Sequence, residues 1–292
     1  MTLLRSLLFI PGNQPRMLDK ALGFAPDAYV PDLEDSVPAE EKANARKVTA
    51  SFLPKLWQSG HAVIPRANAL QTGLMEDDLA AVVGPHILGV SVGKVCTTQD
   101  ISQISDTMDR LEEKVGLVKG QLKLVPWIET TEAIVNVYHI CRSSPRIIAV
   151  GFGAEDFTND MGIERSEDNS EIEYARNVVC VAARAAGVLA LDTPYFQFRD
   201  PDGLRRDAVA GKKRGFKGKF AIHPAQIEPI NEIFSPSPAE IEHARRVVIA
   251  FEEAERHGRG STSLDSKVID VPVVKRARAL LEMAEKLNAS DK

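Results

Sequence analysis

The residues that decide the fold read LKLVPWIETTEA at positions 122–133 and PRIIAVGFGAEDFTND at positions 145–160. Two short apolar runs, Leu122–Ile128 and Ile147–Val150, are bounded by proline or glycine and separated by a helical pattern. Short buried strands that flank a helical segment are typical of a βαβ unit in a parallel sheet. Glu129 follows the first run, and Glu155-Asp156 follows the second. The stretch therefore predicts two parallel strands with carboxylates at their carboxyl ends.

These carboxylates allow two interpretations. At neighbouring strand ends, Glu129 and Asp156 would form a site of oxygen ligands for a hard cation. Alternatively, both cap the helices that follow, where acidic side chains interact favourably with unpaired N–H groups. Gly151, Gly153 and Ala154 remove side-chain bulk beside Asp156, which favours a ligand that touches the backbone there. A dinucleotide-binding GxGxxG motif is excluded, because its third glycine would fall on Asp156.

Apolar, strand-like runs alternate with amphipathic stretches along most of the chain. The predicted strands are Leu3–Pro11, Ala28–Leu33, Ala62–Arg66, Ile87–Val92, Leu122–Ile128, Ile147–Val150, Val188–Leu191 and Gly218–Ile222. The predicted helices are Gln14–Gly23, Pro38–Trp57, Met75–Val83, Ser102–Lys114, Thr131–Cys141, Ile172–Ala186 and Gly203–Arg214. This alternation, with no evident linker, predicts an α/β fold in the form of a single TIM (β/α)8 barrel. A doubly wound sheet is the alternative.

The alternation ends after His223-Pro224, where helical patterns cover residues 228–233, 238–257 and 271–287. We therefore predict a barrel over residues 1–227 and a C-terminal helical extension over residues 228–292. Within the extension, residues 258–270 begin with GRGSTS, a composition typical of a flexible segment. This segment is either a lid that closes over a barrel mouth or a plain surface loop.

The composition is that of a globular protein, with 44% hydrophobic and 26% charged residues among 292. A net charge of -5 argues against a nucleic-acid partner, which usually requires a basic face. No apolar run has the length of a membrane span, and Arg5 interrupts the N-terminal run, which argues against a signal peptide. The cysteines Cys96, Cys141 and Cys180 are odd in number and widely spaced, which predicts reduced thiols in a cytoplasmic protein.

Five motifs occur in order along the chain. They are RSLLFIPG at 5–12, DLEDSV at 32–37, IETTEA at 128–133, GAEDF at 153–157 and IHPAQI at 222–227. Together they resemble the citrate lyase β-subunit-like (CitE-like) branch of the HpcH/HpaI aldolase superfamily. The resemblance covers essentially the whole chain.

The resemblance implies a TIM barrel, a Mg²⁺ ion and a carbon–carbon lyase that reversibly cleaves a hydroxyacyl thioester. The products would be an acetyl or related thioester and a 2-oxo acid, with a coenzyme A thioester as substrate. By position, Glu129 and Asp156 match the family's metal ligands, and Arg66 matches its active-site arginine. Asp270 matches a lid aspartate that often reaches the active site of a neighbouring subunit. The resemblance thus also implies a homo-oligomer, a trimer or a hexamer.

Retro-Claisen cleavage explains these residue types. Arg66 is permanently charged and offers a rigid fork of donors to the oxyanion that develops on the thioester. The backbone amides around Gly153, Ala154 and Glu155 open a helix and are expected to bind the substrate carboxylate. Asp270 is hypothesised to transfer protons, which requires a pKa tuned by burial under the lid.

Other polar residues near strand ends have weaker assignments. Asp35 is placed among the catalytic residues because, with Glu34, it can orient water or Arg66; capping of the next helix is the alternative. Arg16 and Lys42 are candidates to bind the phosphates of coenzyme A, although isolated basic residues are usually solvated.

The lid departs from the family pattern. The family usually has an aromatic residue after the Gly-x-Gly of the lid and a glycine before its aspartate, whereas this chain has STSL at 261–264 and DSK at 265–267. Substrate identity therefore stays open between a stand-alone lyase for malyl-CoA or citramalyl-CoA and an acyl-carrier-dependent subunit of a citrate lyase complex. An aldolase for free hydroxy-oxo acids and a catalytically silent structural subunit are further alternatives.

Overall fold

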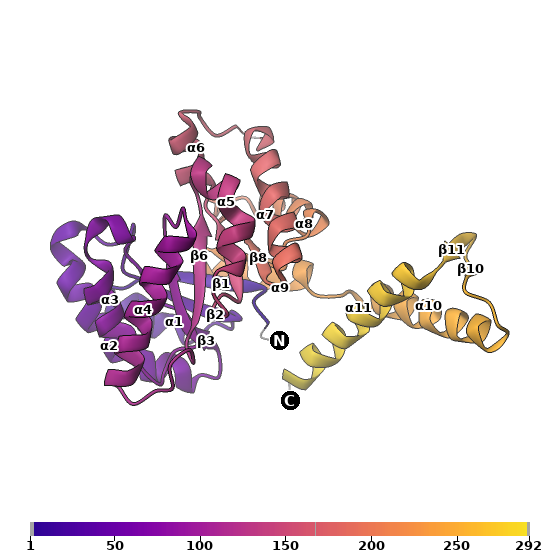
Figure 1. Cartoon of the computed structure of the whole chain (residues 1–292), viewed down its shortest axis with the longest axis horizontal. Helices are drawn as coiled ribbons and strands as arrows, with labels where there is room; N and C mark the ends of the chain where they lie inside the picture. Colours follow the sequence, from indigo (N-terminus) through magenta and orange to yellow (C-terminus); the bar gives the residue numbers. More distant parts are fainter. Residues whose placement is uncertain (1–2, 167, 291–292) are drawn as a thin grey trace. The chain divides into compact units, whose positions relative to one another are not determined.

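The computed structural model describes residues 3–166 and 168–290. Its parallel strands close into a barrel (Figure 1), because β1 (Ser6–Pro11) pairs with both β2 (Ala28–Asp32) and β9 (Gly218–Ala221). The strands between them are β3 (Ala62–Val63), β4 (Arg66–Ala67), β5 (Gly89–Val92), β6 (Lys123–Ile128), β7 (Ala149–Phe152) and β8 (Leu189–Asp192). β3 and β4 both pair with β2 and share one strand position, which leaves eight positions in the described part of the chain. The predicted TIM (β/α)8 barrel is confirmed.

The third predicted strand is interrupted at Ile64-Pro65. Pro65 has no N–H to donate to the sheet, although its carbonyl still accepts a hydrogen bond from the Ser91 N–H at 2.8 Å. Beyond the break, Arg66 pairs directly with Asp32 at the end of β2. The interruption therefore sets two side chains of opposite charge next to each other at the carboxyl end of the barrel.

Helices follow the strands in sequence and cover the barrel. They are α1 (Pro15–Ala21), α2 (Lys42–Gln58), α3 (Met75–Val82), α4 (Thr98–Lys114), α5 (Thr131–Arg142), α6 (Ala154–Met161), α7 (Glu173–Ala186) and α8 (Pro201–Arg214). Short 3-10 helices are η1 (Ala39–Glu41), η2 (Leu70–Thr72), η3 (Ser170–Ile172) and η4 (Pro224–Gln226). α4 begins earlier than the predicted start at Ser102, because Thr97 and Asp100 form a capping box there.

Aromatic side chains fill the interior of the barrel. The ring centroid of Phe9 lies 5.7 Å from that of Trp127 and 5.3 Å from that of Phe220, and the last two lie 4.2 Å apart. The indole N–H of Trp127 donates to Ser91 Oγ at 2.7 Å, so its polar atom is satisfied in the core. Trp127 and Phe220 belong to the apolar core of the barrel, and Phe9 packs against it.

A buried charge network lies between the strands and the helices α7 and α8. Arg176 contacts Asp192 and donates to Asp207 at 3.0 Å. Lys219 Nζ donates to Asp207 at 2.5 Å and to the Thr193 carbonyl at 2.6 Å. Buried ions of this kind require partners, because an unpaired buried charge is strongly destabilising. The network therefore holds the segment that follows β8 in a defined position.

The chain divides into two compact units, one up to Asn231 and one from Glu232 onward. The predicted boundary after residue 227 falls at the start of α9 (Ile227–Phe234), within which the division lies. The second unit contains α10 (Pro238–Arg256) and α11 (Val271–Ser290), which lie side by side (Figure 1). The side chains of its apolar core are Ala244, Val247, Phe251, Ile269, Val274 and Ala277.

The connection between α10 and α11 contains a β-hairpin. β10 (Thr262–Leu264) pairs antiparallel with β11 (Lys267–Ile269). Asp265 and Ser266 form the turn with φ angles of 49° and 60°, the left-handed conformation that two-residue hairpin turns require. Residues 258–270 were predicted to be a flexible segment, either a lid or a surface loop, without a strand, because Asp-Ser is a weaker turn signal than Asn-Gly.

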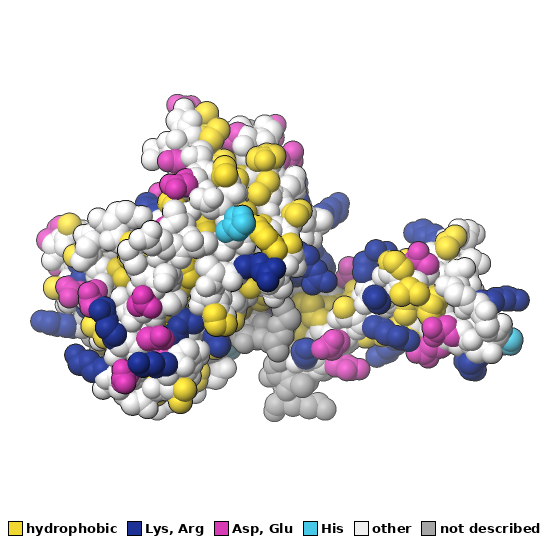
Figure 2. All heavy atoms as spheres, viewed as in Figure 1, with side chains coloured by type: hydrophobic (Ala, Val, Ile, Leu, Met, Phe, Trp, Pro, Cys, Tyr) yellow, Lys and Arg dark blue, Asp and Glu magenta, His cyan; other side chains and the backbone are white. Residues whose placement is uncertain are grey.

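The distribution of charged side chains on the surface agrees with the modest net charge of the chain. On the face that Figure 2 shows, acidic and basic side chains are interspersed over the barrel. No helix among the described residues is both long and apolar enough to cross a membrane. The cysteines are unpaired thiols, and two of them, Cys141 and Cys180, are buried.

Candidate active site

Charged side chains from neighbouring strands meet at the carboxyl end of the barrel. They are Asp32 at the end of β2, Arg66 in β4, Lys94 after β5, Glu129 after β6 and Asp156 in the first turn of α6. Arg66 connects to Asp156 through Glu34 and Lys94, since each contacts the next. The predicted residues Arg66, Glu129 and Asp156 thus belong to one cluster, at the barrel end where catalytic residues usually lie.

Arg66 is held by carboxylates from β2 and the loop that follows it. Its Nε and Nη2 donate to the two oxygens of Asp32 at 2.7 and 2.8 Å. Its Nη1 lies 2.9 Å from Glu34 Oε2 and donates to Asp35 Oδ2 at 3.2 Å. The guanidinium lies over the Phe9 ring, 4.7 Å from the centroid. A bidentate pair of hydrogen bonds to one carboxylate fixes both the position and the orientation of the guanidinium.

The electrostatics of this group keep Arg66 charged. Burial disfavours its charge, but Asp32 and the other carboxylates outweigh burial and raise the pKa of Arg66. Burial also opposes ionisation of Asp32, yet the charge and hydrogen bonds of Arg66 hold the pKa of Asp32 below its usual value. For Glu34, burial prevails over the attraction of Arg66, and its pKa is raised. Arg66 and Asp32 therefore form a stable ion pair, while the charge of Glu34 is less well compensated.

Glu129 is a buried carboxylate of the cluster, as Asp32 and Glu34 are, with 2% of its surface exposed. The Lys94 N–H donates to Glu129 Oε1 at 2.7 Å. A Cβ on Gly153 would collide with Glu129 Oε2, and one on Gly93 would lie 2.9 Å from Oε1, so both glycines make room for this side chain. Burial, and then the charge of Asp156, raise the pKa of Glu129 to about 8. The site therefore favours a cation beside Glu129.

The raised pKa of Glu129 predicts that stability depends on pH. The folded chain retains this proton up to about pH 8, whereas the unfolded chain loses it near pH 4.5. The resulting stabilisation is fully present below the lower value and is lost as the pH rises through the higher one. We expect the Tm in EDTA to fall between about pH 5 and pH 8, and to fall less in Glu129→Gln, whose side chain stays neutral.

The matched control for this experiment is Glu132→Gln, because Glu132 is exposed in the first turn of α5. This variant should follow the pH dependence of the unmodified protein. Equal slopes of Tm against pH in Glu129→Gln and in the unmodified protein would refute the raised pKa.

The capping interpretation is wrong for Glu129 and holds in part for Asp156. Thr130, not Glu129, caps α5, since its side chain accepts the Ala133 N–H at 3.1 Å. Asp156 lies in the first turn of α6, where a negative charge is favoured by the helix dipole. Its side chain is 36% exposed and its Oδ1 lies 3.5 Å from Lys94 Nζ. Asp156 is therefore able to contact a ligand from solvent.

The residues predicted to bind a substrate carboxylate surround the start of α6. Gly153 is the N-cap residue of this helix. The Ala154 N–H donates to Thr193 Oγ1 at 3.2 Å, which joins α6 to the segment after β8. The side chain of Glu155 pairs with Arg165 at 2.9 Å. The assignment of these amides to substrate binding stays a prediction.

The oxygen atoms of the cluster suit a hard divalent cation. Glu129 and Asp156 supply carboxylate oxygens, whereas Glu34 Oε2, although buried without a hydrogen bond in the described structure, is already paired with Arg66 Nη1 at 2.9 Å. No three His, Cys, Asp or Glu side chains of residues 3–166 and 168–290 form a complete metal site. A cation held by two carboxylates would therefore take its other ligands from water and substrate, as Mg²⁺ commonly does.

Of the other predicted residues, Lys42 supports the charge cluster at the strand ends, whereas Arg16 and Asp270 make no described contact with it. Lys42 Nζ donates to the carbonyls of Leu33 and Glu34 at 2.8 and 2.7 Å, which stabilises the loop that holds Arg66. Arg16 is exposed on α1. Asp270 is exposed in the second unit, where its side chain accepts the Val273 N–H of α11 at 3.3 Å. Contacts of Arg16 and Lys42 with coenzyme A, and a catalytic role of Asp270, stay predictions.

Two residues of the cluster, Asp32 and Lys94, were not predicted as site residues from the sequence. The run GVSVGK at 89–94 ends in a glycine and a charged residue directly after a short apolar strand. Glu129 follows its strand in the same way, so position relative to a strand end was the signal that could have identified Lys94.

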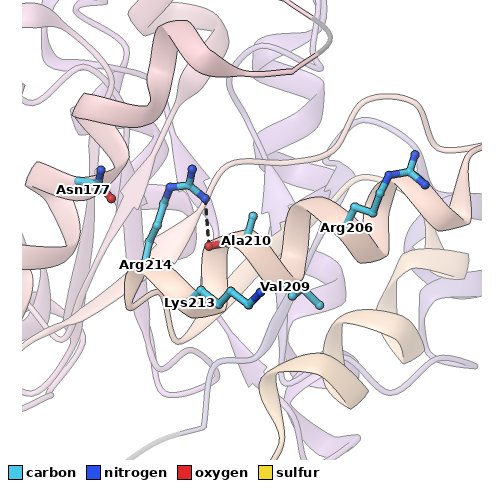
Figure 3. Close-up of a pocket in the computed structure, with 6 residues that line it drawn as sticks. All are labelled: Asn177, Arg206, Val209, Ala210, Lys213 and Arg214. Carbon is cyan, nitrogen blue, oxygen red and sulfur yellow. Dashed lines mark hydrogen bonds between the residues drawn. The ribbon is translucent and has the colours of Figure 1, made fainter.

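A separate basic pocket lies on the outside of the barrel at α7 and α8 (Figure 3). Its volume is about 600 Å³, and it is lined by Asn177, Arg206, Val209, Ala210, Lys213 and Arg214. Arg214 donates to the Ala210 carbonyl at 3.1 Å, the contact drawn in Figure 3, and also pairs with Glu173. None of these lining residues belongs to the cluster at the strand ends. The pocket is therefore distinct from the candidate active site.

Comparison with known proteins agrees with this geometry. The family described as HpcH/HpaI aldolase/citrate lyase matches residues 5–224. The citrate lyase subunit beta of Escherichia coli is 37% identical over 281 residues, which cover 96% of this chain and 93% of that protein. A (3S)-malyl-CoA thioesterase of Cereibacter sphaeroides is 36% identical over 285 residues, covering 98% of this chain and 96% of that protein.

A solved structure shows the same fold over nearly the whole length. The CitE protein of Mycobacterium tuberculosis, in complex with magnesium, acetoacetate and coenzyme A, superposes with a TM-score of 0.79 at 26% identity. The match covers 96% of this chain and 97% of that one. The chain therefore belongs to the HpcH/HpaI aldolase/citrate lyase family, in its citrate lyase β-like branch, and is a lyase.

Proposed function

We propose that this protein is a Mg²⁺-dependent lyase that cleaves a short hydroxyacyl-CoA thioester into acetyl-CoA and a 2-oxo acid. Malyl-CoA and citramalyl-CoA are the candidate substrates. The proposal rests mainly on one observation. The charged side chain of Arg66 belongs to the same network of contacts as the carboxylates of Glu129 and Asp156. The magnesium and coenzyme A bound by the related CitE structure support the choice of metal and thioester.

Glu129 and Asp156 are the residues that would hold the metal. Bound there, Mg²⁺ would polarise the hydroxyl and carboxylate oxygens of the oxo-acid half of the substrate. Glu129 is buried, and the absence of a side chain at Gly93 and Gly153 leaves the space that its carboxylate occupies. Asp156 is more exposed and closes the site from the side of α6.

The reaction requires a defined movement of protons and electrons. The hydroxyl group loses its proton to water, and the bond between the hydroxyl carbon and the thioester α-carbon breaks. The hydroxyl carbon becomes the carbonyl of the 2-oxo acid, while the electron pair passes to the thioester as an enolate. The enolate then takes up a proton at carbon to give the acetyl thioester. Arg66 stabilises the negative charge on the enolate oxygen, because Asp32 holds its charged fork in place before the substrate arrives.

Asp270 is proposed to deliver the proton to the enolate carbon. Replacing it with asparagine retains its size and its hydrogen bond at the start of α11 but removes the transferable proton. We expect Asp270→Asn to lower kcat about 100-fold, within the range for loss of general acid–base catalysis, and to leave Mg²⁺ affinity unchanged. Steady-state kinetics and calorimetry with Mg²⁺ measure the two quantities.

Asp265→Asn is the matched control, since Asp265 lies in the nearby hairpin turn and forms an exposed ion pair with Arg246. Its kcat should stay near that of the unmodified protein. Full activity of Asp270→Asn would exclude the proton-transfer role.

The test of the proposed function is a cleavage assay of the purified protein with each thioester, first with Mg²⁺ and then with EDTA. Release of acetyl-CoA together with glyoxylate from malyl-CoA, or with pyruvate from citramalyl-CoA, would establish the lyase and its 2-oxo acid. Loss of product in EDTA would establish the metal requirement. If the protein binds Mg²⁺ under the assay conditions but turns over neither thioester, these two substrates are rejected.

A second candidate activity is hydrolysis of the thioester, which is favoured by the relative named (3S)-malyl-CoA thioesterase. Hydrolysis of malyl-CoA yields malate and a thiol, whereas cleavage keeps the thioester bond and yields glyoxylate. Thiol detection and glyoxylate detection in the same reaction therefore separate the two activities. Turnover only with a carrier-bound thioester would instead indicate a subunit of a citrate lyase complex, the function of the relative from Escherichia coli.

The proposal includes a homo-oligomer, a trimer or a hexamer, which the resemblance to the family implies. Light scattering on the purified chain measures its mass directly. A monomer of 32.0 kDa would exclude a site shared between subunits.

A further inference from the structure

The backbone at Lys94 has an unusual conformation. Its φ angle of 53° lies in the left-handed region, which lysine rarely adopts. The conformation is held at both sides, because the Lys94 N–H donates to Glu129 at 2.7 Å and its carbonyl accepts from Gln71 Nε2 at 3.2 Å. Such strained residues persist where the surrounding structure fixes them, and they concentrate at functional sites.

The consequence is that Lys94 points its ammonium group into the acidic cluster. Its Nζ lies 3.2 Å from Glu34 Oε1 and 3.5 Å from Asp156 Oδ1. With the backbone contact to Glu129, one residue touches three acidic side chains. Lys94 itself is held as a cation, since Glu34 and the other carboxylates outweigh burial and raise its pKa.

The charges of the cluster explain why a cation is needed there. Asp32 takes the two-pronged contact of Arg66, so that pair is largely neutral. Glu34 and Asp156, which contact the Lys94 ammonium, and Glu129, which accepts the Lys94 N–H, surround the place where a divalent cation would bind. Like charges this close repel one another strongly in a partly buried site.

We propose that Lys94 is an internal counter-cation that holds this site together when no divalent cation is bound and competes with the cation for Asp156. Binding of the divalent cation must move the ammonium away from Asp156, because two positive charges cannot share one carboxylate without repulsion. The backbone contact with Glu129 does not involve the ammonium, so it keeps Lys94 beside the site after this movement. The competition with the cation rests on the proposed function, whereas the counter-cation role in the cation-free protein does not.

Lys94→Asn is the variant that tests this role. Asparagine is neutral and adopts positive φ angles more readily than most residues, so the backbone conformation is retained. We expect Mg²⁺ to bind about 10-fold more tightly or better, because about 1.4 kcal/mol of removed repulsion suffices for that factor. In EDTA we expect the Tm to fall by about 3 °C or more, and Mg²⁺ to raise it more than in the unmodified protein.

Two further variants serve as controls. Lys94→Arg keeps the positive charge and should restore both the Tm in EDTA and the weaker Mg²⁺ affinity. Lys119→Asn removes a charge from an exposed pair with Glu113, 3.1 Å apart, and should change neither quantity. Titration calorimetry with MgCl2 and thermal denaturation with and without EDTA provide the readouts, and neither depends on catalytic activity.

The outcomes separate this proposal from the proposed function. Unchanged or weaker Mg²⁺ binding by Lys94→Asn would overturn the competition between ammonium and cation. Failure of the unmodified protein to bind Mg²⁺ would reject the metal of the proposed function. The Tm in EDTA would then decide: a lower Tm of Lys94→Asn that Lys94→Arg restores supports the counter-cation, and an unchanged Tm overturns it.

Discussion

Asp156→Ala is expected to abolish Mg²⁺-dependent turnover while leaving the fold intact. Asp156 is one of two carboxylates available to the metal, and its side chain is 36% exposed, with Oδ1 3.5 Å from Lys94 Nζ. Loss of a metal ligand should lower kcat/KM at least about 1,000-fold, which corresponds to about 4 kcal/mol of transition-state stabilisation. Cleavage assays over a range of Mg²⁺ concentrations, together with circular dichroism, measure activity and folding.

Asp202→Ala is the matched control, because Asp202 occupies the first turn of α8 as Asp156 occupies that of α6. Both variants lose a favourable interaction with a helix dipole, which is worth less than about 1 kcal/mol at an exposed position. If capping were the role of Asp156, the two variants would behave alike. Retention of full activity by Asp156→Ala would show that the metal assignment is wrong.

Arg66→Lys is expected to lower kcat at least about 100-fold, the scale observed when a donor to a developing oxyanion is removed. Lysine keeps the positive charge but cannot make the two-pronged contact with Asp32, so its ammonium is no longer fixed relative to the substrate. The effect should fall mainly on kcat, because the negative charge on the thioester oxygen develops only in the transition state. Steady-state kinetics with the thioester separate kcat from KM.

The control for Arg66→Lys is a second buried arginine far from the strand ends that carry the site. Arg146 lies before β7, has a side chain that is 4% exposed, and binds Glu112 through Nη1 at 3.0 Å. Arg146→Lys should cost stability in the same way and leave kcat unchanged. Equal losses of kcat in both variants would indicate a general effect of buried arginine replacement and would exclude a specific role of Arg66.

Most of the site could be predicted from the sequence, because its residues lie at the ends of predicted strands. Arg66, Glu129 and Asp156 each lie at or just after a short apolar run, and the carboxyl ends of parallel strands meet at one end of a barrel. Lys94 has the same position but lacks a recognisable motif. Its importance depends on a φ angle of 53°, which no local pattern indicated.

The partners of these residues required the tertiary structure. Arg66 finds Asp32 across 34 positions of sequence, and Lys94 finds Glu34 across 60. The strand register and the side-chain conformations decide such pairs, and neither is encoded within a few residues. The same holds for Gly153, because its neighbour Glu129, with which a Cβ at position 153 would collide, comes from another strand end.

The sequence by itself determined the barrel, since alternating apolar and amphipathic runs encode local hydrogen bonding and burial. It also determined the family, through five motifs in order. Only the tertiary structure decided that Thr130 rather than Glu129 caps α5, and that residues 262–269 form a hairpin. It alone showed a lysine ammonium beside Glu34 and Asp156. The physical reason is that charge interactions act through space, between side chains that the chain brings together only after it has folded.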